Sequence, residues 1–210
     1  MIRILIADDH AIIRHGLKQI IEESGEMRVV AEADSGIDAL RKIRGIECDA
    51  VVLDIAMPDM SGIDVLKQIH ADKPHLPILI LSIYSEDQYA VRLIRAGAAG
   101  YMTKESAPSE VVKALLRVAG GKKYISPVVA EILAGEIGMN EEKLPHKNLS
   151  DREYQIFLLL ASAMTVSEIA DSLALSVKTV STYRSRILEK MRLNNNAELM
   201  RYAIDNHLAQ

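Results

Sequence analysis

Short apolar runs alternate with helical patterns over residues 1–120. The runs span residues 2–7, 29–33, 50–53, 78–81 and 100–102, and the segments with helical spacing span 11–21, 36–44, 62–70, 87–96 and 108–119. Strands that alternate with helices in this way form a parallel sheet covered on both faces. The pattern therefore predicts an α/β domain over residues 1–120, with a (βα)5 flavodoxin-like parallel sheet.

The pattern changes after residue 120. Two glycines end the last helical segment, and a short helix is expected from Ser126-Pro127 to about residue 134. The remainder of 121–146 is polar and is interpreted as a linker. Ser150 and Glu153 form a capping box pattern, which marks the start of a helix. From this point on, the apolar residues recur at helical spacing. Helices expected at 151–161, 166–173, 177–191 and 197–206 make residues 147–210 a small all-α domain.

Charge is divided unevenly between these two parts. Residues 1–146 hold 17 Lys and Arg against 22 Asp and Glu, whereas residues 147–210 hold 8 against 7, which indicates different partners for each part. Cys48 is the only cysteine, so no internal disulfide is expected and a reducing, cytoplasmic location fits best. There is no signal-peptide pattern and no apolar stretch of about 18 residues, so no membrane segment is expected.

Polar side chains follow four of the five predicted strands. Asp8 and Asp9 end the first strand, Asp54 the third, Ser82 the fourth and Lys104 the fifth. The carboxyl ends of parallel strands meet at one edge of a sheet, where ligands bind. An Asp in such a place is often only a helix cap, but one cap does not explain two adjacent acids. We therefore expect these side chains to form one site.

Three carboxylates with oxygen-only partners and no histidine or cysteine suit a hard divalent ion, and Mg²⁺ is expected. Such an ion offsets the repulsion between Asp8 and Asp9. Asp54 is then placed to act as a carboxylate nucleophile that forms an acyl phosphate. Lys104 and Ser82 are placed to contact the transferred phosphoryl group.

The segments ILIADDH, VVLDIAMPDMSG and LS, followed by the stretch 101–104, resemble the receiver domain of two-component response regulators over residues 1 to about 120. The resemblance implies that Asp54 is the phosphoacceptor and that a sensor histidine kinase is a partner. It implies metal ligation by Asp9, Asp54 and the backbone carbonyl of Ala56, with Asp8 acting through water.

The resemblance also implies a switch in which the Ser82 hydroxyl moves toward the phosphoryl group and Tyr101 follows. Two positions depart from the receiver pattern. Ile83 stands where a small residue is common, which would narrow access to Asp54. Glu105 stands where a proline often follows the lysine, so this peptide need not be cis.

In the C-terminal part, the segments 166–173 and 177–191 are joined by a tight turn, which is typical of a helix-turn-helix. One stripe of the second helix is apolar and is expected to pack inward: Val177, Val180, Ile187, Leu188 and Met191. The opposite face carries Lys178, Thr182, Ser185 and Arg186. A cationic helix with short polar side chains suits the DNA major groove, although an ordinary solvated face is an alternative.

The stretch from 149 to 191 resembles the LuxR-type helix-turn-helix, so nearly the whole chain resembles a NarL/FixJ-class response regulator, and KTVSTYRSRILEKM resembles its GacA/UvrY-type members. The resemblance implies that DNA contacts come from Lys178, Thr179, Ser181, Thr182, Ser185 and Arg186. It implies dimerisation through Leu199, Met200 and Tyr202. Arg184, Ala163 and Val166 depart from the residues usual in this family.

Together these features predict a transcription regulator that binds inverted-repeat DNA as a dimer after phosphorylation, and that catalyses only its own phosphorylation and dephosphorylation. A metal-dependent phosphatase or phosphotransferase is one alternative. The haloacid-dehalogenase pattern, however, needs an acid two residues after the nucleophile, where this chain has Ala56. The second alternative is a DNA-binding protein whose receiver takes no phosphate and serves only as an interaction module. The complete set of acids, serine and lysine argues against this alternative.

Overall fold

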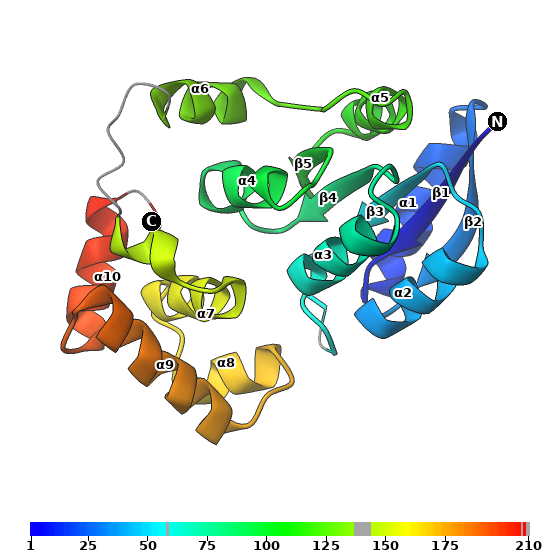
Figure 1. Ribbon diagram of the computed structural model, residues 1–210. Helices are drawn as coiled ribbons and strands as arrows, with labels where there is room; N and C mark the ends of the chain where they lie inside the picture. The colour runs from blue at the N-terminus through cyan, green and yellow to red at the C-terminus, as the bar shows by residue number, and fades with distance from the viewer. Residues whose placement is uncertain (58, 137–143, 207, 209–210) are drawn as a thin grey trace. The chain divides into compact units, whose positions relative to one another are not determined.

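The five apolar runs form one parallel sheet with strand order β2-β1-β3-β4-β5 in the computed structural model of the chain (Figure 1). The strands are β1 (Ile2–Ala7), β2 (Met27–Ala33), β3 (Ala50–Leu53), β4 (Ile78–Ser82) and β5 (Gly100–Thr103). Strand β1 pairs with β2 and β3, and the register places Ala7 beside Ala33 and Leu53. The acids that follow β1 and β3 therefore start from neighbouring positions at one edge.

The structure describes residues 1–57, 59–136, 144–206 and 208, which divide into two units, Met1–Leu133 and Ala134–Gln210. The first unit adds to the sheet the helices α1 (Ala11–Glu23), α2 (Gly36–Gly45), α3 (Gly62–Asp72), α4 (Glu86–Arg95) and α5 (Pro108–Ala119). Helix α6 (Pro127–Glu136) lies in the predicted linker. Residues 137–143 of that linker are outside the described residues. The predicted flavodoxin-like α/β class is confirmed.

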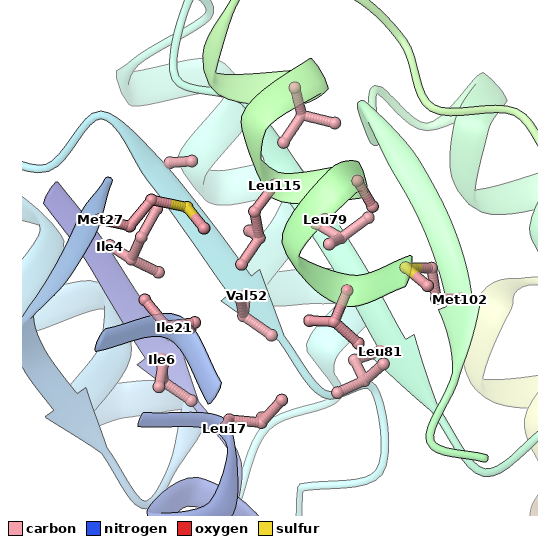
Figure 2. Close-up of a cluster of buried hydrophobic side chains, with 14 residues drawn as sticks. Ile4, Ile6, Leu17, Ile21, Met27, Val52, Leu79, Leu81, Met102 and Leu115 are labelled. Atoms are coloured by element: carbon pink, nitrogen blue, oxygen red, sulfur yellow. The ribbon is translucent and has the colours of Figure 1, made fainter. Parts of the chain in front are cut away.

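One face of the sheet packs against α1 and α5 (Figure 2). In this cluster Ile4 and Ile6 of β1 meet Leu17 of α1, and Leu115 reaches the sheet from α5. Leu5, which points to the other face, is also fully buried, and α2, α3 and α4 cover that side. Because both faces of the strands are covered, both must be apolar. This is why the strands appear in the sequence as unbroken apolar runs.

From residue 144 onward, the described part of the second unit has a 3₁₀ turn followed by four α-helices: η1 (Pro145–Asn148), α7 (Asp151–Ala161), α8 (Val166–Ser172), α9 (Val177–Met191) and α10 (Asn196–Asp205). The predicted capping box starts α7, where the Ser150 hydroxyl accepts from the Glu153 N–H and the Glu153 carboxylate accepts from the Ser150 N–H. No helix in the described part of the chain is both long enough and apolar enough to cross a membrane.

Two details of this unit differ from the sequence pattern. The predicted linker extends to residue 146, but His146 belongs to η1 and is buried, with its Nδ1 2.8 Å from the Tyr202 hydroxyl. Val177 is predicted to pack inward, but it is 50% exposed because it is the first residue of α9. The rest of the predicted apolar stripe of α9 is buried.

Candidate functional site

The carboxyl ends of β1, β3, β4 and β5 bring the predicted site residues together. Asp8 and Asp54 are each 1% exposed, and Ser82 is completely buried. The Lys104 Nζ atom lies 2.7 Å from Asp8 Oδ2 and 2.7 Å from Asp54 Oδ2. One buried ammonium group is therefore shared by two buried carboxylates, which leaves this trio with an excess negative charge.

Asp9 adds a third carboxylate to this group, and it does not cap α1. The N-cap residue of α1 is His10, and its side chain makes no capping hydrogen bond. One carboxylate oxygen from each of Asp8, Asp9 and Asp54 and one ring nitrogen of His10 lie within 4.8 Å of one another. Sequence reasoning missed His10, although its place directly after the two acids was an available signal.

Burial and the shared lysine set the protonation of the site. Burial raises the pKa of Asp54 above its ordinary value, and the nearby Lys104 offsets this only in part. Burial by itself would lower the pKa of Lys104, but its contacts with Asp54 and Asp8 outweigh burial and raise it. Lys104 therefore stays charged, and Asp54 is more basic than an exposed carboxylate, which suits the nucleophilic role predicted for it.

The start of α3 holds the Asp54 backbone in place. Asp54 Oδ1 accepts a hydrogen bond of 3.1 Å from the Ala56 N–H. Gly62, the first residue of α3, packs directly against the preceding turn. A Cβ atom at Gly62 would lie 2.2 Å from the Asp54 carbonyl oxygen and 2.5 Å from the Ile55 Cα. Only glycine permits this close approach of helix to backbone.

We expect Gly62→Ala to destabilise the first unit by about 3 kcal/mol, because the added methyl group forces main-chain atoms apart. Gly16→Ala is a matched control, since a Cβ at Gly16 in α1 would meet nothing within 4 Å. That replacement should stabilise the helix by about 1 kcal/mol. Urea unfolding of both variants measures the two effects. Equal unfolding midpoints would contradict the close-approach explanation.

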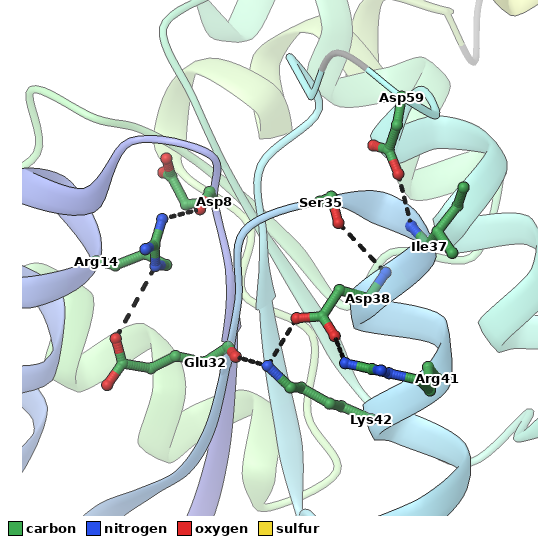
Figure 3. A network of polar contacts seen from close by, with 9 residues as sticks. All are labelled: Asp8, Arg14, Glu32, Ser35, Ile37, Asp38, Arg41, Lys42 and Asp59. Atoms are coloured by element: carbon green, nitrogen blue, oxygen red, sulfur yellow. Dashed lines mark hydrogen bonds and ion pairs between the residues drawn. The ribbon is translucent and has the colours of Figure 1, made fainter.

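Polar contacts from α1 and α2 fix the loops around the acids (Figure 3). Arg14 Nη1 donates to the Asp8 carbonyl oxygen at 2.7 Å. Asp59, in the loop after β3, accepts from the Gly36 and Ile37 N–H groups at 2.9 Å each and so closes the start of α2. Burial acts to raise the pKa of Asp59, but these N–H groups lower it below its usual range. The sequence analysis assigned no role to Arg14 or Asp59.

The predicted switch pair is linked through Tyr84. The Ser82 hydroxyl accepts from the Tyr84 N–H at 3.2 Å, and the Tyr101 hydroxyl donates to the Tyr84 carbonyl oxygen at 2.7 Å. Tyr101 is buried, and burial raises the pKa of its phenol. Ile83 is largely exposed, and its predicted effect on access to Asp54 stays a prediction.

The acids of the site fit a divalent cation. Asp9 Oδ1 is buried and accepts no hydrogen bond from any residue that the structure describes. Lys104 compensates one of three clustered carboxylates, so negative charge is left over. A cation bound to the carboxylate oxygens would give Asp9 Oδ1 a partner and offset the remaining negative charge. Carboxylate oxygens are the donors that Mg²⁺ prefers. The chemistry of the donor set thus agrees with the expected metal.

The predicted DNA contacts lie along one side of α9. Lys178, Ser181, Thr182, Ser185 and Arg186 are exposed, and Thr179 is half-buried, with its hydroxyl 2.7 Å from that of Ser176. The hydroxyls of Thr182 and Ser185 donate to the carbonyl oxygens of Lys178 and Ser181. Each hydroxyl uses its proton within the helix, so toward a DNA group it can act only as an acceptor.

Two departures from the family pattern have local explanations. Arg184 Nε donates to Asn196 Oδ1 at 2.6 Å, so this side chain ties α9 to the start of α10. Ala163 has a φ of 63°, a left-handed conformation that glycine adopts without strain. Glycine, the residue usual at this position in the family, therefore suits the turn better than the alanine of this chain.

The predicted dimer contacts need one correction. Leu199 is 0% exposed, and a side chain with no accessible surface cannot touch a second chain. We therefore assign Leu199 to the core of the second unit. Met200 and Tyr202 are partly exposed, and Ile204 on the same helix is exposed. Met200 and Tyr202 stay the predicted dimer contacts on α10.

Two family models match the chain. The response regulator receiver domain matches residues 4–116, and the luxR family of bacterial regulatory proteins matches residues 147–203. A receiver domain followed along the chain by a luxR-type helix-turn-helix domain defines a DNA-binding two-component response regulator. The chain belongs to the LuxR family of these regulators, whose members are transcription regulators and not enzymes.

Relatives cover almost the whole chain. Response regulator GacA of Pseudomonas aeruginosa is 37% identical over 205 residues, which cover 97% of this chain and 96% of GacA. Response regulator UvrY of Escherichia coli strain K12 is 36% identical over 97% of this chain and 94% of UvrY. A solved structure of RcsB from Salmonella enterica serovar Typhimurium is also similar, and it contains the promoter rprA and the phosphomimetic BeF3-. Its TM-score is 0.67 at 26% sequence identity, and the match covers 96% of this chain and 97% of the RcsB chain. The predicted resemblance is confirmed.

Proposed function

We propose that Mg²⁺-dependent phosphorylation of Asp54, from a sensor histidine kinase or a small phosphodonor, switches this regulator. The observation that carries the proposal is the Lys104 ammonium group, 2.7 Å from both Asp54 and Asp8. A helix cap or an ordinary surface acid needs no buried lysine. A buried nucleophilic carboxylate that must accept a charged group does need one.

Phosphoryl transfer depends mainly on positioning and charge compensation. An Asp54 carboxylate oxygen forms the bond to phosphorus while the bond from phosphorus to the donor's leaving atom breaks, and the leaving group keeps the electron pair. Lys104 then pairs with an oxygen of the transferred group, and the Ser82 hydroxyl donates to another. Hydrolysis of the resulting acyl phosphate resets Asp54.

Asp9, Asp54 and the Ala56 carbonyl, with Asp8 acting through water, would hold Mg²⁺. The bound ion supplies positive charge that offsets the charge of the phosphoryl group. These roles rest on the receiver resemblance and on the fit of the carboxylate donors described above.

We expect Asp9→Ala to lower phosphorylation by acetyl phosphate at least about tenfold and to remove its dependence on Mg²⁺, because too few hard ligands remain. Intact mass measured against Mg²⁺ concentration is the readout. Asp34→Ala is the control, since Asp34 is an exposed acid directly after β2. Normal Mg²⁺ dependence in Asp9→Ala would place the metal site elsewhere.

A contact path supports coupling from Ser82 to the linker. Helix α4 follows Tyr84 after its N-cap residue, Ser85, and its first residue, Glu86, accepts a hydrogen bond from the Ser126 hydroxyl. Ser126 also accepts from the Val129 N–H at 3.2 Å and so closes the start of α6. A shift of Tyr84 on phosphorylation would therefore reach the segment that leads to the second unit.

We further propose that phosphorylation promotes binding of a dimer to inverted-repeat DNA, with α9 in the major groove and α10 at the dimer contact. The exposed cationic side of α9 supports the first part, and partly exposed Met200 and Tyr202 support the second. Such a regulator acts where the chromosome lies, in the bacterial cytoplasm. Its chemistry is restricted to its own phosphorylation and dephosphorylation.

A further inference from the structure

The His10 ring approaches the acidic site without forming an aligned hydrogen bond. Its Nδ1 lies 2.7 Å from Asp9 Oδ1 and 3.3 Å from Asp8 Oδ1. Asp9 Oδ1 nevertheless accepts no hydrogen bond from any described residue. A ring nitrogen and a carboxylate oxygen this close, without an N–H directed between them, bring their electron pairs together. That arrangement is favourable when both atoms bind the same cation.

The spacing fits two ligands of one ion. Donor atoms that are each about 2.1 Å from a common ion lie about 3.0 Å apart at octahedral angles and about 3.4 Å apart at tetrahedral angles. The distance from His10 Nδ1 to Asp8 Oδ1, 3.3 Å, falls in this range, and the distance to Asp9 Oδ1, 2.7 Å, is slightly shorter. The His10 side chain is 57% exposed, so an ion can reach the nitrogen directly from solvent.

The ring of His10 contacts the acids Asp8 and Asp9 and does not cap its own helix. His10 is the N-cap residue of α1, but its side chain makes no capping bond. Its backbone N–H, not its ring, donates to Asp8 Oδ1 at 2.8 Å. Replacement of the side chain therefore leaves the contact that holds this turn in place.

We propose that His10 makes the acidic site a mixed nitrogen and oxygen site, which binds a transition-metal ion of the Zn²⁺ type through Asp8, Asp9 and His10. This inference rests on the proposed metal site and extends it to a second class of ion. Mg²⁺ takes oxygen ligands, whereas Zn²⁺ binds both imidazole nitrogen and carboxylate oxygen. Because both ions need Asp9, Zn²⁺ competes with Mg²⁺ and holds the regulator unphosphorylated.

The test is calorimetric titration of the full chain with ZnCl₂ and, separately, with MgCl₂, and native mass spectrometry gives the number of ions bound. We expect His10→Ala to weaken Zn²⁺ binding at least about tenfold and to change Mg²⁺ affinity less than about twofold. His15→Ala, which removes an exposed histidine of the same helix, should change neither. His10→Gln, which keeps a polar side chain without the imidazole, should behave as His10→Ala does.

Unchanged Zn²⁺ affinity in both His10 variants would overturn the inference. An equal loss of Zn²⁺ and Mg²⁺ affinity would also overturn it, because His10 would then support the site rather than supply a nitrogen ligand. Phosphorylation by acetyl phosphate and Mg²⁺ is measured in parallel. If the wild-type protein binds Zn²⁺ through His10 but gains no phosphoryl group, the proposed function fails while this inference stands.

Discussion

Asp54→Asn is expected to gain no phosphoryl group from acetyl phosphate and Mg²⁺, whereas the wild-type protein gains one. The amide oxygen of asparagine is a poor nucleophile and carries no charge to direct toward phosphorus. The rival acceptor is Asp8, which is equally buried and equally close to Lys104. Asp8→Asn is therefore the matched control, and it should still be modified, at a lower rate. A full adduct on Asp54→Asn would assign the chemistry to another residue.

Asp54→Asn should also stabilise the folded protein when metal is absent. Because the pKa of Asp54 is raised by burial, the folded state binds this proton more tightly than the unfolded chain does. Ionised Asp54 therefore lowers the free energy of unfolding at neutral pH, and stability increases as pH falls through the raised folded-state pKa. Removing the charge should raise the melting temperature in EDTA by a few degrees, as about 1 kcal/mol does. Added Mg²⁺ should stabilise the wild-type protein and not Asp54→Asn.

The strands and the sheet-edge site follow from local sequence because each depends on a short pattern. Strand β3 is four consecutive buried residues, so its apolar run ends abruptly at Asp54. The convergence of Asp8, Asp54 and Lys104 then follows from the parallel topology alone. These residues are far apart in the sequence, and the parallel order of the strands is what brings them to one edge of the sheet.

Other features were not predictable because they depend on distances across the fold. Gly62 is required by the approach of α3 to the Asp54 carbonyl, and no pattern around residue 62 reports that distance. Asp59 caps α2 from another loop, so no local capping pattern reveals it. Leu199 has helical spacing typical of either a core or a dimer contact, and only its packing separates the two.

Control of DNA binding is the remaining prediction with a large effect. We expect the fragment 147–210 to bind an operator without phosphorylation, because residues buried within the second unit give it a core of its own, including Phe157, Ile169 and Ile187. The unphosphorylated full chain should bind the same operator more weakly, and phosphorylation should restore binding. A gel shift on one operator compares the three proteins. Equal binding by all three would exclude control by the receiver unit.

The same assay tests the DNA-facing side of α9. Lys178 is exposed in the first turn of this helix, where a cation meets backbone phosphates. Lys178→Ala should weaken binding by a similar factor on every sequence and reduce the slope of log affinity against log salt concentration by about 1. Lys122→Ala removes the same charge from an exposed position of the receiver unit and should leave the slope unchanged. If the two variants have the same salt dependence, Lys178 does not contact a phosphate, and if the fragment 147–210 binds no DNA, α9 is not a recognition helix.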